Sequence, residues 1–133
     1  MNAVLQCLVA LAPLAQYCLD AMHSADCRLE HCMWCLFEKQ VVACLNASGK
    51  CIPPLHLVNN MHQISRHLRI GRQEDAHEFL IALMESLQRA TLRRFASRMP
   101  AEVGPTAAAH AALAVTSDVY ALFGGRLCST VVW

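Results

Sequence analysis

Histidine and cysteine residues gather in one short stretch of the chain, with a spacing that suits a metal ion. His23 is followed by Cys27, Cys32 and Cys35, and the last two form a Cys-x2-Cys pair. Thiolates and an imidazole hold Zn²⁺ in tetrahedral structural sites, which leave no position open for water. His31 could replace His23 as a ligand. In the alternative interpretation, Cys32 and Cys35 are core residues at the start of a helix, and the sequence leaves both open.

Two carboxylates stand at the start of the helix with the clearest pattern in the chain. Asp75 and Glu78 are three residues apart and share one helix face, and Gln73 lies just before them. Such a pair can bind a cationic peptide, because hydrogen bonds between arginine and carboxylate are charge-assisted and often bidentate. It can also be a solvated acidic first turn that complements the helix dipole. His77, between the two, is interpreted as a packing or hydrogen-bonding residue.

Composition limits the class of protein. The chain has 133 residues, 56% of them hydrophobic and 16% charged, with a net charge of +1. This length suits one domain with a modest core. The small net charge gives no indication of a nucleic-acid partner, and no apolar run has the length of a membrane span. Eight cysteines without a convincing secretory signal predict reduced thiols and a cytoplasmic and/or nuclear location.

Hydrophobic periodicity predicts a mainly α-helical chain. The firmest helix covers 73–92, where apolar residues recur at the spacing of one buried face: Ala76, Phe79, Leu80, Leu83, Met84 and Leu87. Further helices are predicted over 2–10, 14–22, 32–46 and 55–68. In the helix over 32–46, the residues expected to face inward are Leu36, Val41 and Leu45.

The last part of the chain reads differently. Proline, glycine and a run of alanine over 95–116 predict a linker. A short helix is predicted over 117–122. After Gly124 and Gly125, the β-branched residues over 127–133 predict a strand.

Three motifs then occur in the order of one protease family. The string QEDAHEFL over 73–80 resembles the Q-x-D-A-H-E-F signature of the ubiquitin-specific proteases, peptidase family C19. MNAVLQCL over 1–8 is similar to the run directly after the nucleophile in that family's G-N-T-C-F-M-N-x-x-L-Q-x-L pattern. FGGRLCS over 123–129 resembles its F-G-G-x-L-x-S segment. The chain therefore resembles an N-terminal fragment of that catalytic domain, starting just after the catalytic cysteine.

The resemblance implies a fold and a division of the chain. The fold would be the helical, thumb-like lobe of a papain-like cysteine protease, ending in one β-strand of a sheet that the chain does not supply. Residues 1–133 would be a partial catalytic domain. Within it, 1–92 would form the helical lobe, 95–116 the linker, and 117–133 a helix and strand that enter the fingers region.

The resemblance also implies a thiol-dependent deubiquitinase, which removes ubiquitin from protein conjugates and needs no catalytic cofactor. Gln73, Asp75 and Glu78 match positions that bind the C-terminal tail of ubiquitin. Ubiquitin and ubiquitinated proteins are the expected partners, with neither nucleic acid nor membrane. The family's nucleophile would precede Met1 and its catalytic histidine would lie downstream, so this chain alone is expected to be a truncated, inactive fragment. Cys7 is interpreted as a small buried thiol rather than a replacement nucleophile.

Two other functions stay open. The chain could be a non-catalytic ubiquitin-binding module that uses the face of Asp75 and Glu78. It could also be a zinc-stabilised helical interaction protein that is unrelated to ubiquitin. Stoichiometric zinc without ubiquitin binding would identify the second alternative. Ubiquitin affinity that falls when both carboxylates are removed would identify the first.

Overall fold

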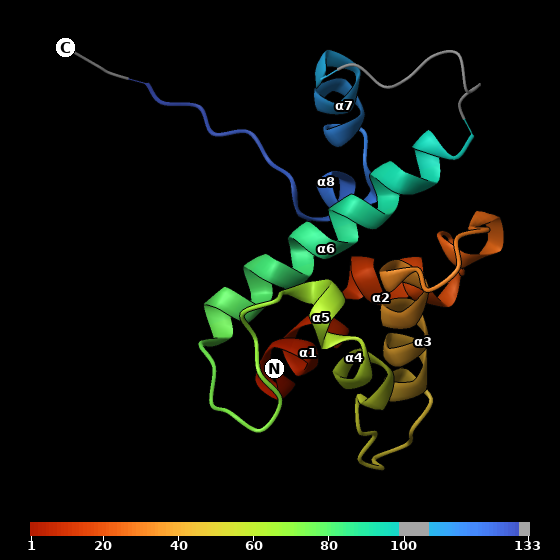
Figure 1. Cartoon of the computed structure of the whole chain (residues 1–133), viewed down its shortest axis with the longest axis vertical. Helices are drawn as coiled ribbons and strands as arrows, with labels where there is room; N and C mark the ends of the chain where they lie inside the picture. The colour runs from red at the N-terminus through yellow and green to blue at the C-terminus, as the bar shows by residue number, and fades with distance from the viewer. Residues whose placement is uncertain (99–106, 131–133) are drawn as a thin grey trace.

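The computed structural model describes residues 1–98 and 107–130. In this part of the chain, helices pack around the long helix α6. In Figure 1, α6 (Ala76–Ala96) runs diagonally through the molecule, with α1 to α5 on one side and α7 and α8 on the other. The segment after α8 leaves the body of the molecule, and the Leu127 side chain is fully exposed. The predicted mainly α-helical fold is confirmed.

The helices follow the hydrophobic pattern closely. Those predicted over 2–10, 14–22, 32–46, 73–92 and 117–122 are confirmed, with shifts of a few residues at their ends. Pro13 lies in the first turn of α2, where the missing N–H removes no helical hydrogen bond. The remaining elements are α1 (Asn2–Val9), α2 (Ala12–Leu19), the 3-10 turn η1 (Ser24–Asp26), α3 (Met33–Leu45), α4 (Leu55–Asn59), α5 (Met61–Ile64), α7 (Ala107–Ala114) and α8 (Asp118–Phe123).

The core lies where α3 meets α2 and α6. Trp34 and Phe37 of α3 are completely buried, and their rings meet edge to face with centroids 5.9 Å apart. Leu83 and Leu87 of α6 are also completely buried. Each such side chain stabilises the fold by roughly 1.5–3 kcal/mol relative to an exposed position. Leu45, the last residue of α3, is 38% exposed and does not face inward as predicted.

The helix predicted over 55–68 is wrong in its length. It divides into α4 and α5 at Asn60, whose backbone leaves helical geometry with φ −110° and ψ 20°. The Asn60 side-chain amide donates a hydrogen bond of 2.9 Å to the carbonyl of His56. Local side-chain bonds of this kind compete with continued helix. Residues 65–75 then form a loop that leads into α6.

The last part of the chain also differs from expectation. The predicted linker over 95–116 includes the end of α6 and the whole of α7, while 99–106 lie outside the described residues. The strand predicted over 127–133 is not formed in 127–130, and 131–133 lie outside the described residues. A lone strand has no partner for its backbone hydrogen bonds, so the sequence pattern cannot produce a sheet without a second strand.

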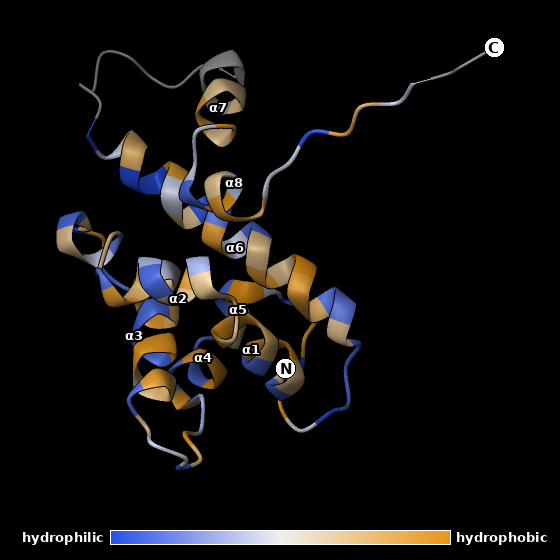
Figure 2. Cartoon of the chain, turned by 180° about the vertical axis from the view of Figure 1, so that it is seen from behind, coloured by the Kyte–Doolittle hydropathy of each residue, from blue (hydrophilic) through white to orange (hydrophobic). Residues whose placement is uncertain are grey.

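Hydropathy is distributed as the packing requires. In Figure 2 the loop before α6 is mostly hydrophilic, whereas α1, α3 and α4 are rich in hydrophobic residues. Over the described residues, no single helix is both long and apolar enough to cross a membrane. When α1 and the segment Ala12–Asp26 are taken together as one bent pair, at 81° to each other, their combined length and composition meet that requirement.

Candidate functional site

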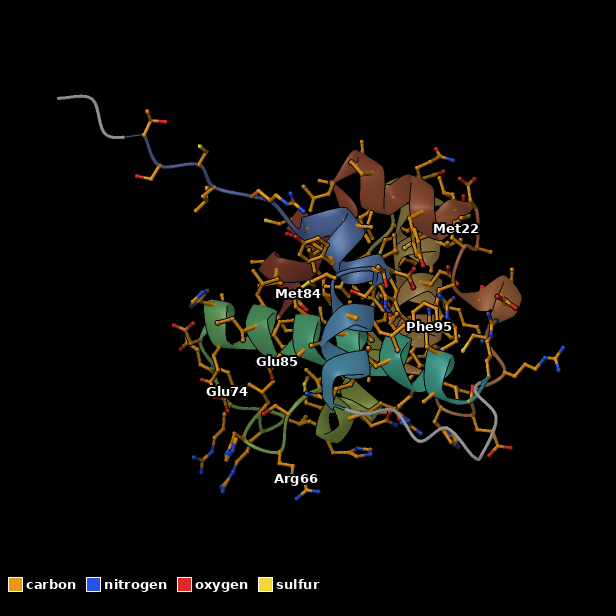
Figure 3. The ribbon with its side chains drawn as sticks, turned by 90° about the horizontal axis from the view of Figure 1, so that it is seen from above. Met22, Arg66, Glu74, Met84, Glu85 and Phe95 are labelled. Atoms are coloured by element: carbon orange, nitrogen blue, oxygen red, sulfur yellow. The ribbon has the colours of Figure 1, made fainter. Side chains whose placement is uncertain are left out.

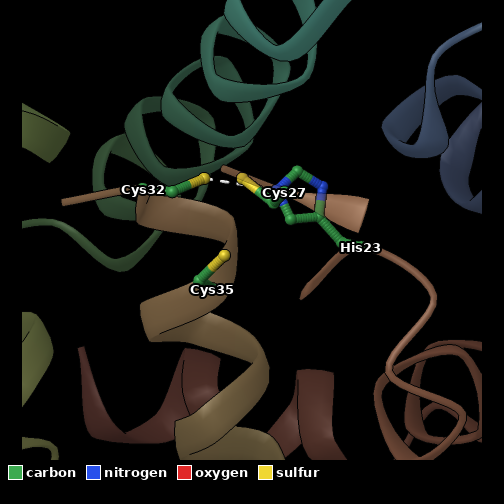
Figure 4. Close-up of side chains that lie close together, drawn as sticks. All are labelled: His23, Cys27, Cys32 and Cys35. Carbon is green, nitrogen blue, oxygen red and sulfur yellow. Dashed lines mark hydrogen bonds between the residues drawn. The ribbon is translucent and has the colours of Figure 1, made fainter. Parts of the chain in front are cut away.

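His23, Cys27, Cys32 and Cys35 come together between η1 and the start of α3, as one of the two interpretations of their spacing expected (Figure 4). Their donor atoms all lie within 4.8 Å of one another. In a tetrahedral zinc site with Zn–S bonds of about 2.3 Å, the sulfur atoms are about 3.8 Å apart, so this group needs only a small contraction. His31 is exposed and lies outside the group. The four residues could therefore hold a metal ion.

Local backbone geometry brings the four donors to one point. Cys32 is the N-cap of α3, and Cys35 follows one turn later on the same side of the helix. His31 has a left-handed φ of 51°, which turns the chain sharply into α3. The short 3-10 turn η1 folds the preceding segment back, so that His23 and Cys27 face the helix start. Four protein donors of this kind suit a structural metal rather than a catalytic one.

The position of His23 is fixed by residues of α3. His23 is completely buried, and its ring stacks on Trp34 with centroids 5.6 Å apart. The two carboxylate oxygens of Glu38 accept hydrogen bonds from the backbone N–H groups of His23 at 3.3 Å and Ser24 at 3.2 Å. The sequence pattern did not single out Glu38. Its one signal is its spacing of four residues from Trp34, which places a carboxylate on the buried face of α3.

A second carboxylate, Asp118, faces the other edge of the His23 ring from the first turn of α8. His23 Nε2 lies 3.2 Å from Cys32 Sγ, while His23 Nδ1 lies 3.5 Å from Asp118 Oδ2. Arg94 of α6 donates a hydrogen bond of 3.2 Å to the same oxygen. Neither Asp118 nor Arg94 was predicted as part of a site. No sequence signal pairs them with His23, because they join it from distant parts of the chain.

Charge in this cluster is balanced among close neighbours. Burial opposes ionisation of Asp118, but His23, Tyr17 and Arg94 stabilise the carboxylate and lower its pKa. Burial also opposes the charge on His23, yet Asp118 and Cys32 raise the pKa of the imidazole to about 9. Burial favours the thiol form of Cys32, and contacts with His23 and the backbone of Cys35 lower its pKa. These contacts favour the thiolate of Cys32, which is the form in which cysteine binds metals.

The turn that carries the donors is also tied to the residues just after α6. Arg98 forms an ion pair with Asp26 of η1 and donates a 2.7 Å hydrogen bond to the Asp26 backbone carbonyl. The Arg98 guanidinium lowers the pKa of the Asp26 carboxyl. Because both side chains are largely exposed, the contribution of this pair to stability is small.

The second predicted group lies at the start of α6, on the opposite side of the molecule's core. Asp75 is the N-cap of α6, and its Oδ1 accepts hydrogen bonds from the N–H groups of His77 at 2.7 Å and Glu78 at 3.0 Å. These bonds hold the pKa of Asp75 below its usual value. Gln73, His77 and Glu78 are exposed. Asp75 therefore caps the helix, and one of its carboxylate oxygens is still available to a ligand.

The start of α6 lies beside the start of α1. Met1, Glu74 and Phe79 line a small cavity of about 130 Å³ together with Val58, Met61 and residues 68–72. Figure 3 shows Arg66 and Glu74 projecting from the loop before α6, while Glu85 lies farther along that helix. The prediction that Cys7 is a buried thiol is wrong. Cys7 is exposed, because α1 turns Leu5 and Leu8 toward the core instead.

Comparison with known proteins gives consistent matches. The sequence model of the family described as "Ubiquitin carboxyl-terminal hydrolase" matches residues 1–133. Ubiquitin carboxyl-terminal hydrolase 42 of Homo sapiens is 44% identical over 92 residues, which are 68% of this chain and 7% of that protein. Ubiquitin C-terminal hydrolase 15 of Oryza sativa subsp. japonica is 39% identical over 131 residues, 98% of this chain and 12% of that protein. Ubiquitin carboxyl-terminal hydrolase 23 of Arabidopsis thaliana is 37% identical over 132 residues, 98% of this chain and 14% of that protein. The chain thus spans a small fraction of the length of these relatives.

Proposed function

Because the chain belongs to the ubiquitin carboxyl-terminal hydrolase family, we propose that it contributes the helical lobe of a thiol-dependent deubiquitinase. The whole protein would remove ubiquitin from protein conjugates. Its partners would then be ubiquitin and ubiquitinated proteins, without nucleic acid or membrane, in the cytoplasm and/or nucleus. The family match over residues 1–133 is the observation that carries this proposal.

In this proposal, residues 1–133 bind ubiquitin and another part of the protein cleaves the bond. The motif over 1–8 resembles the run after the family's nucleophile, so in this proposal that cysteine would precede Met1. Met1 lines a cavity together with Glu74, so a thiol preceding α1 would lie near the carboxylates at the start of α6. A thiol at the N-terminus of α1 would also gain from the helix dipole, which favours the thiolate.

The carboxylates of Asp75 and Glu78 would hold the cationic tail of ubiquitin. Both side chains are exposed on one face of the first turn of α6. Glu78 has no hydrogen bond to its side chain among the described residues, and Asp75 uses one oxygen as a helix cap. Arginine side chains bind such free carboxylate oxygens with charge-assisted hydrogen bonds. Gln73, exposed just before the cap, would add a polar contact to the tail.

The first test is reaction of the chain with ubiquitin that carries a thiol-reactive group at its C-terminus, measured by intact mass. We expect no adduct, because in this proposal none of the eight cysteines of this chain is the nucleophile. Exposed Cys7 is the residue to examine if an adduct forms. A specific adduct on Cys7 would overturn the placement of the nucleophile outside this chain.

The second test measures binding of ¹⁵N-labelled ubiquitin by NMR. Asp75→Asn keeps a good N-cap residue while removing the charge, and Glu78→Gln removes the second charge. Glu85→Gln is the matched control, since Glu85 is an exposed carboxylate on the same helix outside the first turn. We expect the wild-type chain to change the chemical shifts of the ubiquitin tail. The affinity for ubiquitin should fall severalfold in the double variant and stay unchanged in the control. Equal binding by all variants would contradict a role for this acidic pair.

We further propose that the group of His23 and the three cysteines binds a structural zinc ion. Zinc would be held by His23 Nε2 and three thiolates, and it would tie η1 to the start of α3. Purified chain should contain about one zinc per molecule, and Cys35→Ser should lose it. Co²⁺ substitution should give the intense charge-transfer absorption of tetrahedral thiolate coordination. The zinc site would be refuted if the purified chain contains no metal and folds equally well with and without a strong chelator.

A further inference from the structure

We propose that Asp118 orients His23 for metal binding, so that the metal centre fastens α8 to the helical lobe. The inference rests on the proposed zinc site and concerns a residue outside its four ligands. Asp118 opens α8, the helix that leads into the segment over 124–130. The metal would therefore influence an element that contributes no ligand to it.

The two nitrogens of His23 have separate roles in the geometry. Nε2 points toward the cysteine sulfurs, 3.2 Å from Cys32 Sγ, and is the nitrogen placed to bind the ion. Nδ1 points toward α8, 3.5 Å from Asp118 Oδ2. A histidine that binds a metal through one nitrogen usually donates its other N–H to a carboxylate, carbonyl or water, which fixes its tautomer and ring orientation.

Asp118 is the carboxylate placed to accept that hydrogen from His23. Within the described part of the chain, His23 Nδ1 is buried and has no hydrogen bond. A buried N–H without an acceptor is costly, so a modest approach of Asp118 from 3.5 Å would be favourable. Glu38, the other carboxylate near His23, is engaged with backbone N–H groups. Arg94 holds Asp118 from the side of α6.

Asp118 therefore connects the metal centre to α6 and α8 together. Contacts with α6 already hold the start of α8, among them the pair of Arg94 with Asp118 itself. Ser117, its buried N-cap, donates a 2.6 Å hydrogen bond to Gln88 of α6, and Gln88 in turn donates to the Ala114 carbonyl at 3.2 Å. A metal-oriented imidazole would add an attachment of α8 to the metal centre through Asp118.

The first experiment measures the zinc affinity of the full chain by competition with a chromogenic chelator. Asp118→Asn keeps the size of the side chain while removing its charge, and Asp118→Ala removes the acceptor as well. We expect zinc affinity to fall about 10- to 100-fold, with the larger loss in Asp118→Ala. Ser117→Ala is the matched control, since it loosens the same helix through Gln88 without touching His23. It should change zinc affinity much less than either Asp118 variant.

The second experiment follows hydrogen exchange of the α8 amides, with zinc and with a chelator, in chain verified as folded by circular dichroism. Zinc should slow exchange over Val119–Phe123 in the wild type, and Asp118→Asn should lose most of this effect. Wild-type chain that binds no zinc would refute the zinc site itself. Wild-type chain that binds zinc, with an unchanged affinity in both Asp118 variants, would overturn the coupling alone. Equal loss of affinity in Ser117→Ala would also overturn it, because general loosening of α8 would then explain the effect.

Discussion

Replacing Glu38 by glutamine tests how much this carboxylate stabilises the turn that carries His23. The Glu38 side chain is 3% exposed, and each of its oxygens accepts a backbone N–H, one from His23 and one from Ser24. Glutamine keeps the shape but offers only one acceptor oxygen, so one N–H would face an amide NH₂ group instead. An orphaned buried N–H costs about 1–3 kcal/mol.

The net effect of Glu38→Gln depends on a second, opposing change. Removing a buried carboxylate also removes the cost of keeping its charge away from water. Both hydrogen bonds, at 3.3 Å and 3.2 Å, are longer than the usual optimum. We therefore expect a loss of about 1–2 kcal/mol in the free energy of unfolding, the lower half of the range for one orphaned group.

Urea unfolding, with zinc and with a chelator, measures this loss. Glu30→Gln is the control, because Glu30 is an exposed glutamate in the same segment. Its effect should stay within about 0.5 kcal/mol of zero. Since the Glu38 bonds fix the backbone of His23, Glu38→Gln should also weaken zinc binding. If Glu38→Gln behaves like Glu30→Gln in both measurements, the role given to this carboxylate is wrong.

Two other variants test the core and the helix cap. Leu83→Ala should lower the free energy of unfolding in urea by about 2–5 kcal/mol, because the side chain is completely buried, whereas the fully exposed Leu127→Ala should change it by less than about 0.5 kcal/mol. Hydrogen bonds from the N–H groups of Glu78 and His77 lower the pKa of Asp75. The cap should therefore stabilise the fold above the unfolded pKa of about 3.9 and lose this effect as pH falls through the lower folded pKa. An NMR titration of the Asp75 carboxyl should show a midpoint below 3.9, and a midpoint at or above that value would contradict the capping role.

Periodic helices, and the group of His23 and three cysteines as one of two interpretations, could be predicted from the sequence, because both depend on residues close in the chain. The four donors from His23 to Cys35 lie in one segment, so their spacing carries most of the geometry. The helix break at Asn60 could not be foreseen with the same ease, since it depends on competition between a side chain and the backbone for the His56 carbonyl. A pattern of apolar residues does not report that competition.

The contacts that complete the site depend on tertiary packing, which spacing cannot specify. Asp118 lies far from His23 in the sequence, and only the packing of α8 on α6 brings them together. Cys7 shows the same limit for burial. Its residue type favours burial, but the rotation of α1 places Leu5 and Leu8 inward and leaves the thiol exposed. The role of Asp75 as a helix cap, in contrast, was within reach of the sequence, because capping uses only neighbouring residues.

The local origin of the four donors has a consequence for the order of folding. His23 to Cys35 can close around an ion through short loops, which cost little entropy and form quickly. Asp118 reaches His23 only after the intervening chain, including α6, has been made and packed. During synthesis on the ribosome, which proceeds from the N-terminus, the donor segment emerges long before α8. With the proposed zinc site, a nascent chain would therefore bind the ion first and acquire the orienting carboxylate last.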